Sequence, residues 1–273
     1  MYDLLDKKFW VYTPLKNLYQ LEDKITTDTY ELKTQKFRYP NDTMEMMRGG
    51  IIPGDYTVLY SKERHCVVMS DTPMEQYTNQ SVIKNAHGNV LILGLGIGMI
   101  ITALYESQSE RIWDYEIPDE QIIKSITVVE KDKKLIELMK PILENYLKNF
   151  NKDTMDGYTI DFKIIEADAY EYPKTCKEHY DYMYADIWDE YRGFADELRV
   201  FEQLQDLYKD IADEFDGWGY ADANGNNPYD ESPIEHEDYN DYLSSSIIIY
   251  HDFEMIPDET YDNIMEYAEA VAD

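Results

Sequence analysis

The chain has 273 residues, enough for one large α/β domain with an appendage but too few for two full domains of that class. Its 56 acidic residues against 25 basic ones give a net charge of −31, which repels phosphate backbones and argues against a nucleic-acid substrate. No apolar run approaches the roughly 20 residues of a membrane span, and residues 1–6 lack the basic start of a signal peptide, so we expect a cytoplasmic protein without membrane contact.

Residues 1–70 predict a small β-containing appendage that precedes the main fold. Tyr56–Tyr60 and Cys66–Ser70 flank a polar segment and indicate a β-hairpin. Asp71 and Glu75 follow, and they either cap the next helix or face a ligand crevice. The only two cysteines, Cys66 and Cys176, have no partner at metal-ligand spacing, so we expect neither a disulfide framework nor a bound metal.

The most informative segment is Asn89–Met99, in which an apolar strand runs into three glycines and then into a helix-forming stretch. Gly94 permits a sharp turn off the strand, while Gly96 and Gly98 let a ligand and the helix approach bare backbone. The N-terminus of the helix then presents N–H groups to a ligand. This pattern predicts a nucleotide site.

Three further apolar segments each end in an acid. Ser125–Glu130 is followed by Lys131–Asn149, whose apolar residues have helical spacing, and Asp161–Asp168 and Tyr180–Asp186 are two more strands. The fold class expected is α/β, a Rossmann-like, mostly parallel, doubly wound sheet. Because the carboxyl ends of parallel strands lie on one edge, these strand ends can converge on a ligand crevice.

A carboxylate at the end of the second strand can accept hydrogen bonds from a ribose diol. We therefore expect Glu130 to bind ribose, although an acid there can also simply cap the strand end. The gap between Gly98 and Glu130 exceeds the usual spacing of about 20 residues. We assign the excess to an insertion around residues 107–122.

These segments together resemble the spermidine-synthase-like branch of the S-adenosylmethionine-dependent methyltransferase superfamily over about residues 90–190. The resemblance implies that the glycine loop faces the aminoacyl or aminopropyl arm, that the acid of the second strand binds ribose, and that the aspartate of an Asp-Ala pair holds the adenine amino group. It places cofactor binding on Gly94, Leu95, Gly96, Gly98, Glu130, Lys131, Asp168, Ala169 and Asp186.

Aminopropyltransferases carry a D-x-x-D motif after the fourth strand, and Asp186-Ile-Trp-Asp189 has that spacing. The resemblance implies that Asp186 positions or deprotonates an attacking amine. We take Asp189 and Tyr184 as further catalytic candidates. A carboxylate facing an ammonium lowers its desolvation cost and can accept its proton. Trp188 either stacks on a cationic ligand or belongs to the core.

One position departs from the family. Aminopropyltransferases have an aspartate in the glycine loop, and Ile97 stands there instead. Since an apolar residue cannot pair with the ammonium of decarboxylated S-adenosylmethionine, we expect intact S-adenosylmethionine as cofactor and methyl transfer to a small, amine-bearing, cationic acceptor. Aminopropyl transfer from the decarboxylated cofactor is the alternative. In this family the N-terminal β-domain often mediates dimerisation, so the resemblance also implies a homodimer.

Residues 71–273 form the expected nucleotide-binding domain, which is shortened at its C-terminus. We predict an amphipathic helix over Phe194–Phe215, a long acidic loop over 216–246, a strand over Ile247–Tyr250 and a closing helix over Pro257–Ala272. The sheet would then have five or six strands rather than seven.

Charge is concentrated in the C-terminal third. Residues 181–273 hold 27 acidic and three basic residues, a net charge of −24, whereas residues 1–180 carry only −7. Such a region either attracts an organic cation or simply keeps the protein soluble. A further alternative is a non-catalytic protein that uses this surface to imitate nucleic acid and bind a basic partner.

Overall fold

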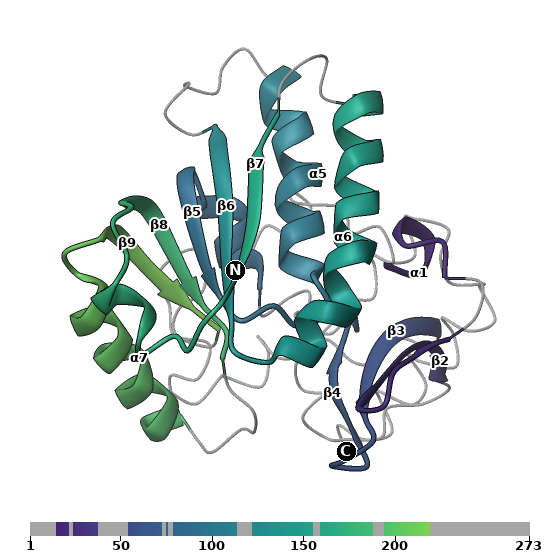
Figure 1. Cartoon of the computed structure of the whole chain (residues 1–273). Helices are drawn as coiled ribbons and strands as arrows, with labels where there is room; N and C mark the ends of the chain where they lie inside the picture. The colour runs from purple at the N-terminus through teal and green to yellow at the C-terminus, as the bar shows by residue number, and fades with distance from the viewer. Residues whose placement is uncertain are drawn as a thin grey trace, which may run out of the picture.

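The computed structural model describes residues 15–21, 24–37, 54–72, 75, 79–113, 122–154, 159–187 and 194–218. These residues form two sheets, a small antiparallel one and a five-stranded parallel one flanked by helices (Figure 1). Within these ranges, no helix combines the length and the apolar composition that crossing a membrane requires.

The antiparallel sheet, here called the N-terminal sheet, contains β1 (Ile25–Thr26), β2 (Tyr30–Phe37), β3 (Gly54–Ser61) and β4 (Cys66–Ser70) in that order. The expected hairpin is confirmed as β3 and β4, which pair antiparallel across a turn. Strand β2 was not predicted, and it pairs with β3 over eight residues. A short helix, α1 (Leu15–Leu18), precedes the sheet.

The parallel sheet has the order β7-β6-β5-β8-β9, and every neighbouring pair is parallel. Its strands are β5 (Gly88–Leu93), β6 (Ile123–Glu130), β7 (Asp161–Glu166), β8 (Tyr180–Ala185) and β9 (Ala212–Gly217). The chain moves outward from β5 through β6 to β7 and then returns to the other side of β5 with β8. Ligands of open α/β sheets bind where the strand order reverses in this way.

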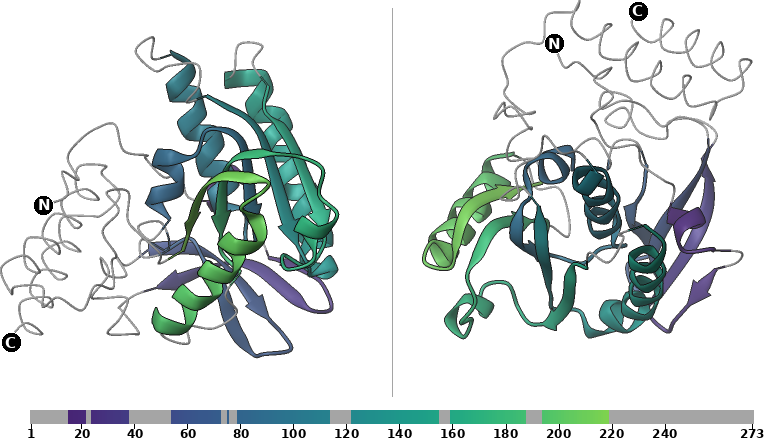
Figure 2. Two further views of the ribbon diagram at one scale, coloured as in Figure 1. Left: turned by 90° about the vertical axis from the view of Figure 1, so that its left-hand side faces the viewer. Right: turned by 90° about the horizontal axis from the view of Figure 1, so that it is seen from above.

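Helices cover both faces of the parallel sheet. Helices α4 (Gln80–Asn85), α5 (Met99–Trp113) and α6 (Lys133–Thr154) pack on one face, and α7 (Phe194–Tyr208) packs on the other, together with the short 3-10 helix η2 (Tyr172–Lys174). Seen from above, α7 and the pair α5 and α6 lie on opposite sides of the sheet (Figure 2). The Rossmann-like fold class is therefore confirmed.

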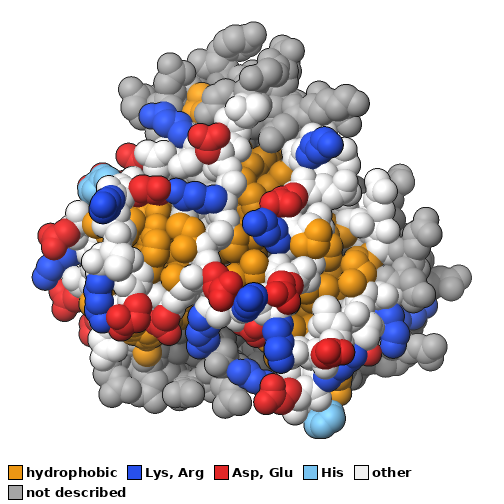
Figure 3. All heavy atoms as spheres, in the orientation of Figure 1, with side chains coloured by type: hydrophobic (Ala, Val, Ile, Leu, Met, Phe, Trp, Pro, Cys, Tyr) orange, Lys and Arg blue, Asp and Glu red, His pale blue; other side chains and the backbone are white. Residues whose placement is uncertain are grey.

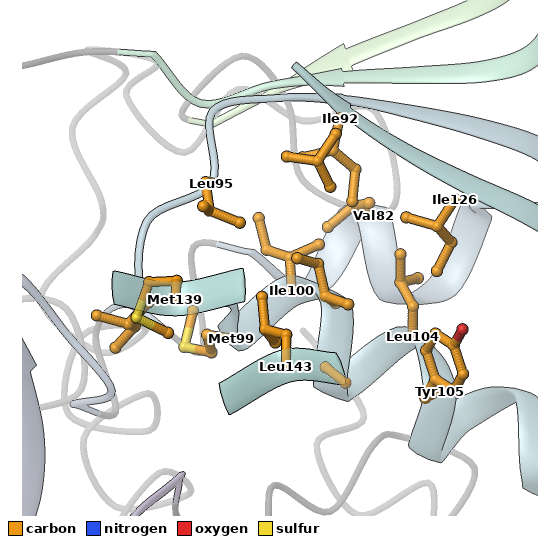
Figure 4. Packing of buried hydrophobic residues seen from close by; sticks show 14 of the residues in the cluster. Val82, Ile92, Leu95, Met99, Ile100, Leu104, Tyr105, Ile126, Met139 and Leu143 are labelled. Carbon is orange, nitrogen blue, oxygen red and sulfur yellow. The ribbon is translucent and has the colours of Figure 1, made fainter. Parts of the chain in front are cut away.

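The larger core cluster lies between β5, β6 and the first three of these helices. Ile126 of β6 lies next to Leu104 of α5, and Ile92 of β5 lies beside Val82 of α4 (Figure 4). Met139 and Leu143 of α6 lie near the start of α5. Leu95 of the glycine loop is 4% exposed and packs into this cluster. The Leu95 side chain thus attaches the glycine loop to the core.

The expected helix over residues 194–215 is wrong at its C-terminal end. Helix α7 ends at Tyr208, whose buried hydroxyl donates to the carbonyl oxygen of Ala169 at 2.7 Å. Ala212–Gly217 then forms strand β9, which pairs with the edge of β8. Two interactions favour a strand here over the helix that the apolar spacing predicts. Strand β9 satisfies the backbone groups of β8, and Tyr182 donates to the buried Asp216 carboxylate at 2.6 Å.

Several other expectations lie outside the described residues. These are the long loop from residue 219 onward, the strand expected over 247–250 and the helix expected over 257–272. Residues 216 and 217 of the expected loop belong to β9. Residues 107–113 of the expected insertion are the last part of α5, so the extra length is at least partly helical.

Candidate functional site

A cavity of about 370 Å³ lies between the carboxyl edge of the parallel sheet and the N-terminal sheet. The parallel sheet contributes residues that follow β5, β6, β7 and β8, and the N-terminal sheet contributes residues of β2, β3 and β4. The predicted convergence of Gly94, Glu130, Asp168 and Asp186 is present, because all four line this cavity.

The glycine loop is a tight turn in which Gly94 has φ +101° and Gly96 has φ +49°. A Cβ atom at Gly94 would collide with the backbone carbonyl oxygen of Asp186, and one at Gly96 would collide with the side chain of Met69. Gly98 does not line the cavity and instead faces Leu143 and Tyr19. Two glycines therefore form the cavity wall, while the third permits close packing.

Glu130 connects the end of β6 to the glycine loop. Its Oε2 accepts the N–H of Leu95 at 3.0 Å, and its Oε1 accepts the N–H of Asp132 at 2.7 Å. Each carboxylate oxygen has a second lone pair, so the group can still accept hydrogen bonds from a ligand. Glu130 thus has a structural function, as expected if it caps the strand end. It also lines the cavity.

Asp168 follows β7 and lines the cavity. Its side chain is exposed, and its Oδ1 accepts the N–H of Tyr170 at 2.8 Å. The carbonyl oxygen of Asp168 accepts the N–H groups of Glu171 and Tyr172 at 3.0 and 2.9 Å. The resulting turn holds Asp168 and the adjacent Ala169 on the cavity wall.

Asp186 follows β8 and is half-buried, and its N–H donates to the carbonyl oxygen of Leu93 at 2.8 Å. This bond places Asp186 directly beside Gly94 at the reversal of strand order. Lys131 and Leu95, the remaining expected cofactor residues, also line the cavity. Asp189 and Trp188 lie outside the described residues.

Tyr184 does not fit the catalytic role expected for it. Its side chain is fully buried, it does not line the cavity, and its hydroxyl donates to Asn79 at 2.7 Å. Burial, with a further contribution from the Asp186 carboxylate, raises the pKa of Tyr184 well above its ordinary value. Because side chains alternate along a strand, Tyr184 faces the helices α4 and α5 rather than the carboxyl edge.

The second wall of the cavity was not predicted from the sequence. The N-terminal sheet supplies Tyr30 and Met69, the turn between β3 and β4 supplies Arg64, and Trp218 after β9 also lines the cavity. Glu75 also lines the cavity, whereas Asp71 is buried and accepts the N–H groups of Leu15 and Thr57. No local pattern marks these residues, because contacts of the N-terminal sheet with the loops after β5 and β6 bring them to the site.

A tyrosine and an aspartate join the two walls. The Tyr30 hydroxyl donates to Asp132 Oδ2 at 2.5 Å. Burial and then the hydrogen bond to Asp132 raise the pKa of Tyr30 well above its ordinary value. Tyr30 therefore stays protonated and keeps this hydrogen bond at neutral pH.

The cavity is acidic. The carboxylates that line it outnumber the basic side chains, which are Arg64 and Lys131. The carboxylates are Glu75, Glu130, Asp132, Asp168 and Asp186. This distribution favours a cationic ligand over an anionic one. Across the described residues, no group of three or more His, Cys, Asp or Glu side chains is arranged to hold a metal ion.

Acidic residues of the C-terminal third also cover an outer surface. In α7 and β9, Glu202, Asp206, Asp213 and Glu214 are exposed and do not line the cavity. On the face of the molecule drawn in Figure 3, acidic and basic side chains are interspersed around hydrophobic ones. Between residues 181 and 218, the acid that reaches the cavity is Asp186, so most described acids there do not face the site.

Ile97 is fully buried in the larger core cluster. Its N–H donates to the sulfur of Met69 at 3.2 Å, and its carbonyl oxygen accepts the Tyr19 hydroxyl at 2.7 Å. The side chain thus points away from the cavity, and this loop position supplies no carboxylate to a ligand.

Two solved structures of spermidine synthases are similar to this chain at low sequence identity. A crystal structure of spermidine synthase in complex with the transition state analogue AdoDATO is 16% identical, covers 70% of this chain and 54% of its own, and has a TM-score of 0.39. A spermidine synthase from Thermotoga maritima is 15% identical, with coverages of 69% and 51% and a TM-score of 0.37. The chain spans about half the length of these structures.

No curated protein sequence matches the chain. The sequence model of the spermine/spermidine synthase domain matches residues 69–215, which begins in β4 and ends in β9. This match includes the glycine loop and the ends of β6, β7 and β8 that line the cavity. Since it covers more than half of the sequence, the chain belongs to the spermine/spermidine synthase domain family.

Proposed function

We propose that the protein is a group transferase of the aminopropyltransferase type, which binds decarboxylated S-adenosylmethionine in the cavity and transfers its aminopropyl group to a small amine. The observation that carries the proposal is the convergence of Gly94, Glu130, Asp168 and Asp186 on one cavity, within the residues that match the family. The family favours aminopropyl transfer over the methyl transfer expected from Ile97.

The strand order supports one orientation of the donor. With adenine beside Asp168 after β7 and ribose on Glu130 after β6, the 5′ carbon points toward β5 and β8. The sulfonium then lies near the glycine loop and Asp186. The acidic lining favours this cation, and it also favours an amine acceptor.

In this arrangement Asp186 orients the acceptor amine and accepts its proton. The nitrogen lone pair attacks the carbon attached to the sulfonium, the carbon–sulfur bond breaks, and a neutral thioether, methylthioadenosine, leaves. The leaving group needs no proton, so the protein contributes chiefly by alignment, by electrostatics and by exclusion of water. Asp189 is assigned as a second carboxylate that contacts the acceptor, and this assignment is based only on the D-x-x-D spacing.

Methyl transfer from intact S-adenosylmethionine is the second candidate. The burial of Ile97 favours it, because the glycine loop offers no carboxylate to the ammonium of an aminopropyl arm. Glu75 is nevertheless a carboxylate on the cavity wall, so the absence of one in the loop does not leave an ammonium without an acidic neighbour.

The test is calorimetric titration with four nucleosides, followed by a transfer assay with a small diamine and mass detection of products. The nucleosides are S-adenosylmethionine, its decarboxylated form, S-adenosylhomocysteine and methylthioadenosine. We expect tight binding of the decarboxylated form and a product heavier by one aminopropyl group. A methylated product from the intact cofactor would establish the second candidate, and no binding of any nucleoside would overturn both.

A further inference from the structure

Met69 of β4 lies against the glycine loop from the opposite wall. A Cβ atom built on Gly96 would collide with the sulfur of Met69, so this thioether covers the bare face of the glycine. The same sulfur accepts the N–H of Ile97 at 3.2 Å. Met69 is half-buried and lines the cavity, so its side chain forms one boundary of the space open to a ligand.

The two features covered by Met69 are those through which a glycine loop receives a ligand. A glycine offers close approach to its backbone, and the following N–H groups offer hydrogen bonds. The N–H of Leu95, one step earlier in the loop, is already bound to Glu130. A ligand group that extends along this loop past Gly96 must therefore take the place of the Met69 thioether.

The strand order indicates which part of the donor reaches this position. If adenine and ribose lie after β7 and β6, as the proposed function requires, the substituent on the 5′ sulfur extends over β5, where Gly96 stands. A methyl substituent ends before Gly96, whereas a longer arm continues toward Met69. The inference rests on the proposed function in this respect.

We propose that Met69 is a specificity-determining residue, which limits how far the 5′-sulfur substituent of a bound adenosine extends along the glycine loop. Short thioethers occupy the cavity with Met69 in place, whereas a longer arm, the aminopropyl arm of the proposed donor included, enters as the flexible Met69 side chain rotates away. A methionine suits this function because its unbranched, flexible side chain fills irregular space and can move without disturbing the backbone.

The test compares methylthioadenosine, which has the short substituent, with S-adenosylhomocysteine, which has a long arm, by calorimetric titration of the full chain. In Met69→Ala the covered part of the loop becomes accessible. We expect S-adenosylhomocysteine to bind about fivefold more tightly than to the unmodified protein, a change typical of one lost sulfur contact. Methylthioadenosine should change by less than about twofold.

Two further variants separate covering from general disturbance. Met69→Leu keeps a carbon atom close to the position of the sulfur but cannot accept the N–H of Ile97, so the preference for the short ligand should persist. Val67→Ala changes an exposed residue of the same strand that does not line the cavity, and both affinities should stay the same. Thermal unfolding of each variant confirms that it is folded.

An unchanged ratio of the two affinities in Met69→Ala would overturn the inference, as would an equal loss of both. In either case the unmodified protein still binds nucleosides, and the proposed function stands. Failure of every nucleoside to bind either protein would overturn the proposed function, and the inference about Met69 with it.

Discussion

The two walls of the cavity are built on different principles. The carboxyl edge of the parallel sheet presents Gly94, Glu130 and Asp186 because each stands at a strand end, where the topology itself brings residues together. The N-terminal sheet presents Tyr30 from the start of β2 and Met69 from within β4, and these reach the cavity only because they contact the loops that follow β6 and β5. The first wall depends on backbone connectivity and the second on side-chain packing.

This difference has a functional consequence. Groups at strand ends are held by backbone hydrogen bonds, as the N–H of Asp186 is held by Leu93, and they suit the parts of a reaction that need fixed geometry. Side chains such as Met69 can change rotamer without moving the sheet. We therefore expect changes on the parallel sheet to affect stability and chemistry strongly, and changes on the N-terminal sheet to adjust binding by smaller amounts.

The largest expected effect is alkaline unfolding of the parallel sheet. Tyr180, Tyr182 and Tyr184 of β8 are buried, and burial is the main cause that raises the pKa of each. Their contribution is complete below the unfolded pKa of about 10 and is lost as the pH rises toward the folded values. Between the unfolded and the folded pKa, each tyrosine lowers the free energy of unfolding by about 1.4 kcal/mol per pH unit. The three tyrosines together therefore lower it by about 4 kcal/mol per pH unit.

Urea unfolding at a series of alkaline pH values measures this slope, and Tyr184→Phe should reduce it by about 1.4 kcal/mol per pH unit. Tyrosinate absorbance should rise together with the loss of circular dichroism, because the buried hydroxyls ionise on unfolding. A free energy of unfolding that stayed constant well above pH 10 would show that β8 does not bury its tyrosines.

Substitution of Asp186 tests the fixed geometry at the strand ends. Asp186→Asn keeps the shape of the side chain but removes its capacity to accept a proton. The transfer rate should fall by about 10²–10⁴-fold, the usual contribution of a general base, while donor affinity changes by less than about threefold. Single-turnover measurements with the amine acceptor separate these two quantities.

Glu214→Gln is the matched control, since Glu214 lies on the adjacent strand β9, is exposed and does not line the cavity. Its transfer rate should equal that of the unmodified protein. If Asp186→Asn reduced donor affinity and left the rate of transfer intact, Asp186 would be a binding residue rather than the base.

Glu130→Gln tests the connection between β6 and the glycine loop. An amide places one N–H₂ group opposite the backbone N–H of either Leu95 or Asp132, so one of the two hydrogen bonds is lost. We expect nucleoside affinity to fall by about 1.5–3 kcal/mol, the usual value of a hydrogen bond to a charged group. Titration with methylthioadenosine measures this change.

Glu166→Gln provides a closely matched control. Glu166 pairs in register with Glu130 on the neighbouring strand β7, but it is exposed and does not line the cavity. Equal losses of affinity in the two variants would mean that charge at this end of the sheet, rather than the position of Glu130, supports binding.

Much of the parallel sheet could be predicted from the sequence, because a strand that ends in glycine or acid is a local signal. Glu130, Asp168 and Asp186 were placed correctly on one edge for this reason. The end of α7 could not be predicted in this way. Ile211 and Phe215 continue the apolar spacing of the helix, and only the unpaired edge of β8 favours a strand instead.

The second wall was unpredictable for a related reason. Met69 and Tyr30 lie in ordinary strands, and nothing in their neighbours distinguishes a side chain that meets the glycine loop from one that meets solvent. Tyr184 shows the opposite error, since it stands next to the strand end but points into the core. Position along a strand is readable from sequence, whereas the partner of a strand residue in a distant loop is not.

The smallest expected effect concerns the hydrogen bond between the walls. Tyr30→Phe removes the bond to Asp132, so the free energy of unfolding should fall by about 1 kcal/mol and nucleoside affinity by less than about threefold. Tyr60→Phe, in a tyrosine of β3 that does not line the cavity, is the control and should leave both unchanged. Urea unfolding and titration with methylthioadenosine measure the two quantities. A loss of affinity as large as that of Glu130→Gln would show that Tyr30 orders the strand-end wall, and the distinction between a wall built by topology and one built by packing would then fail.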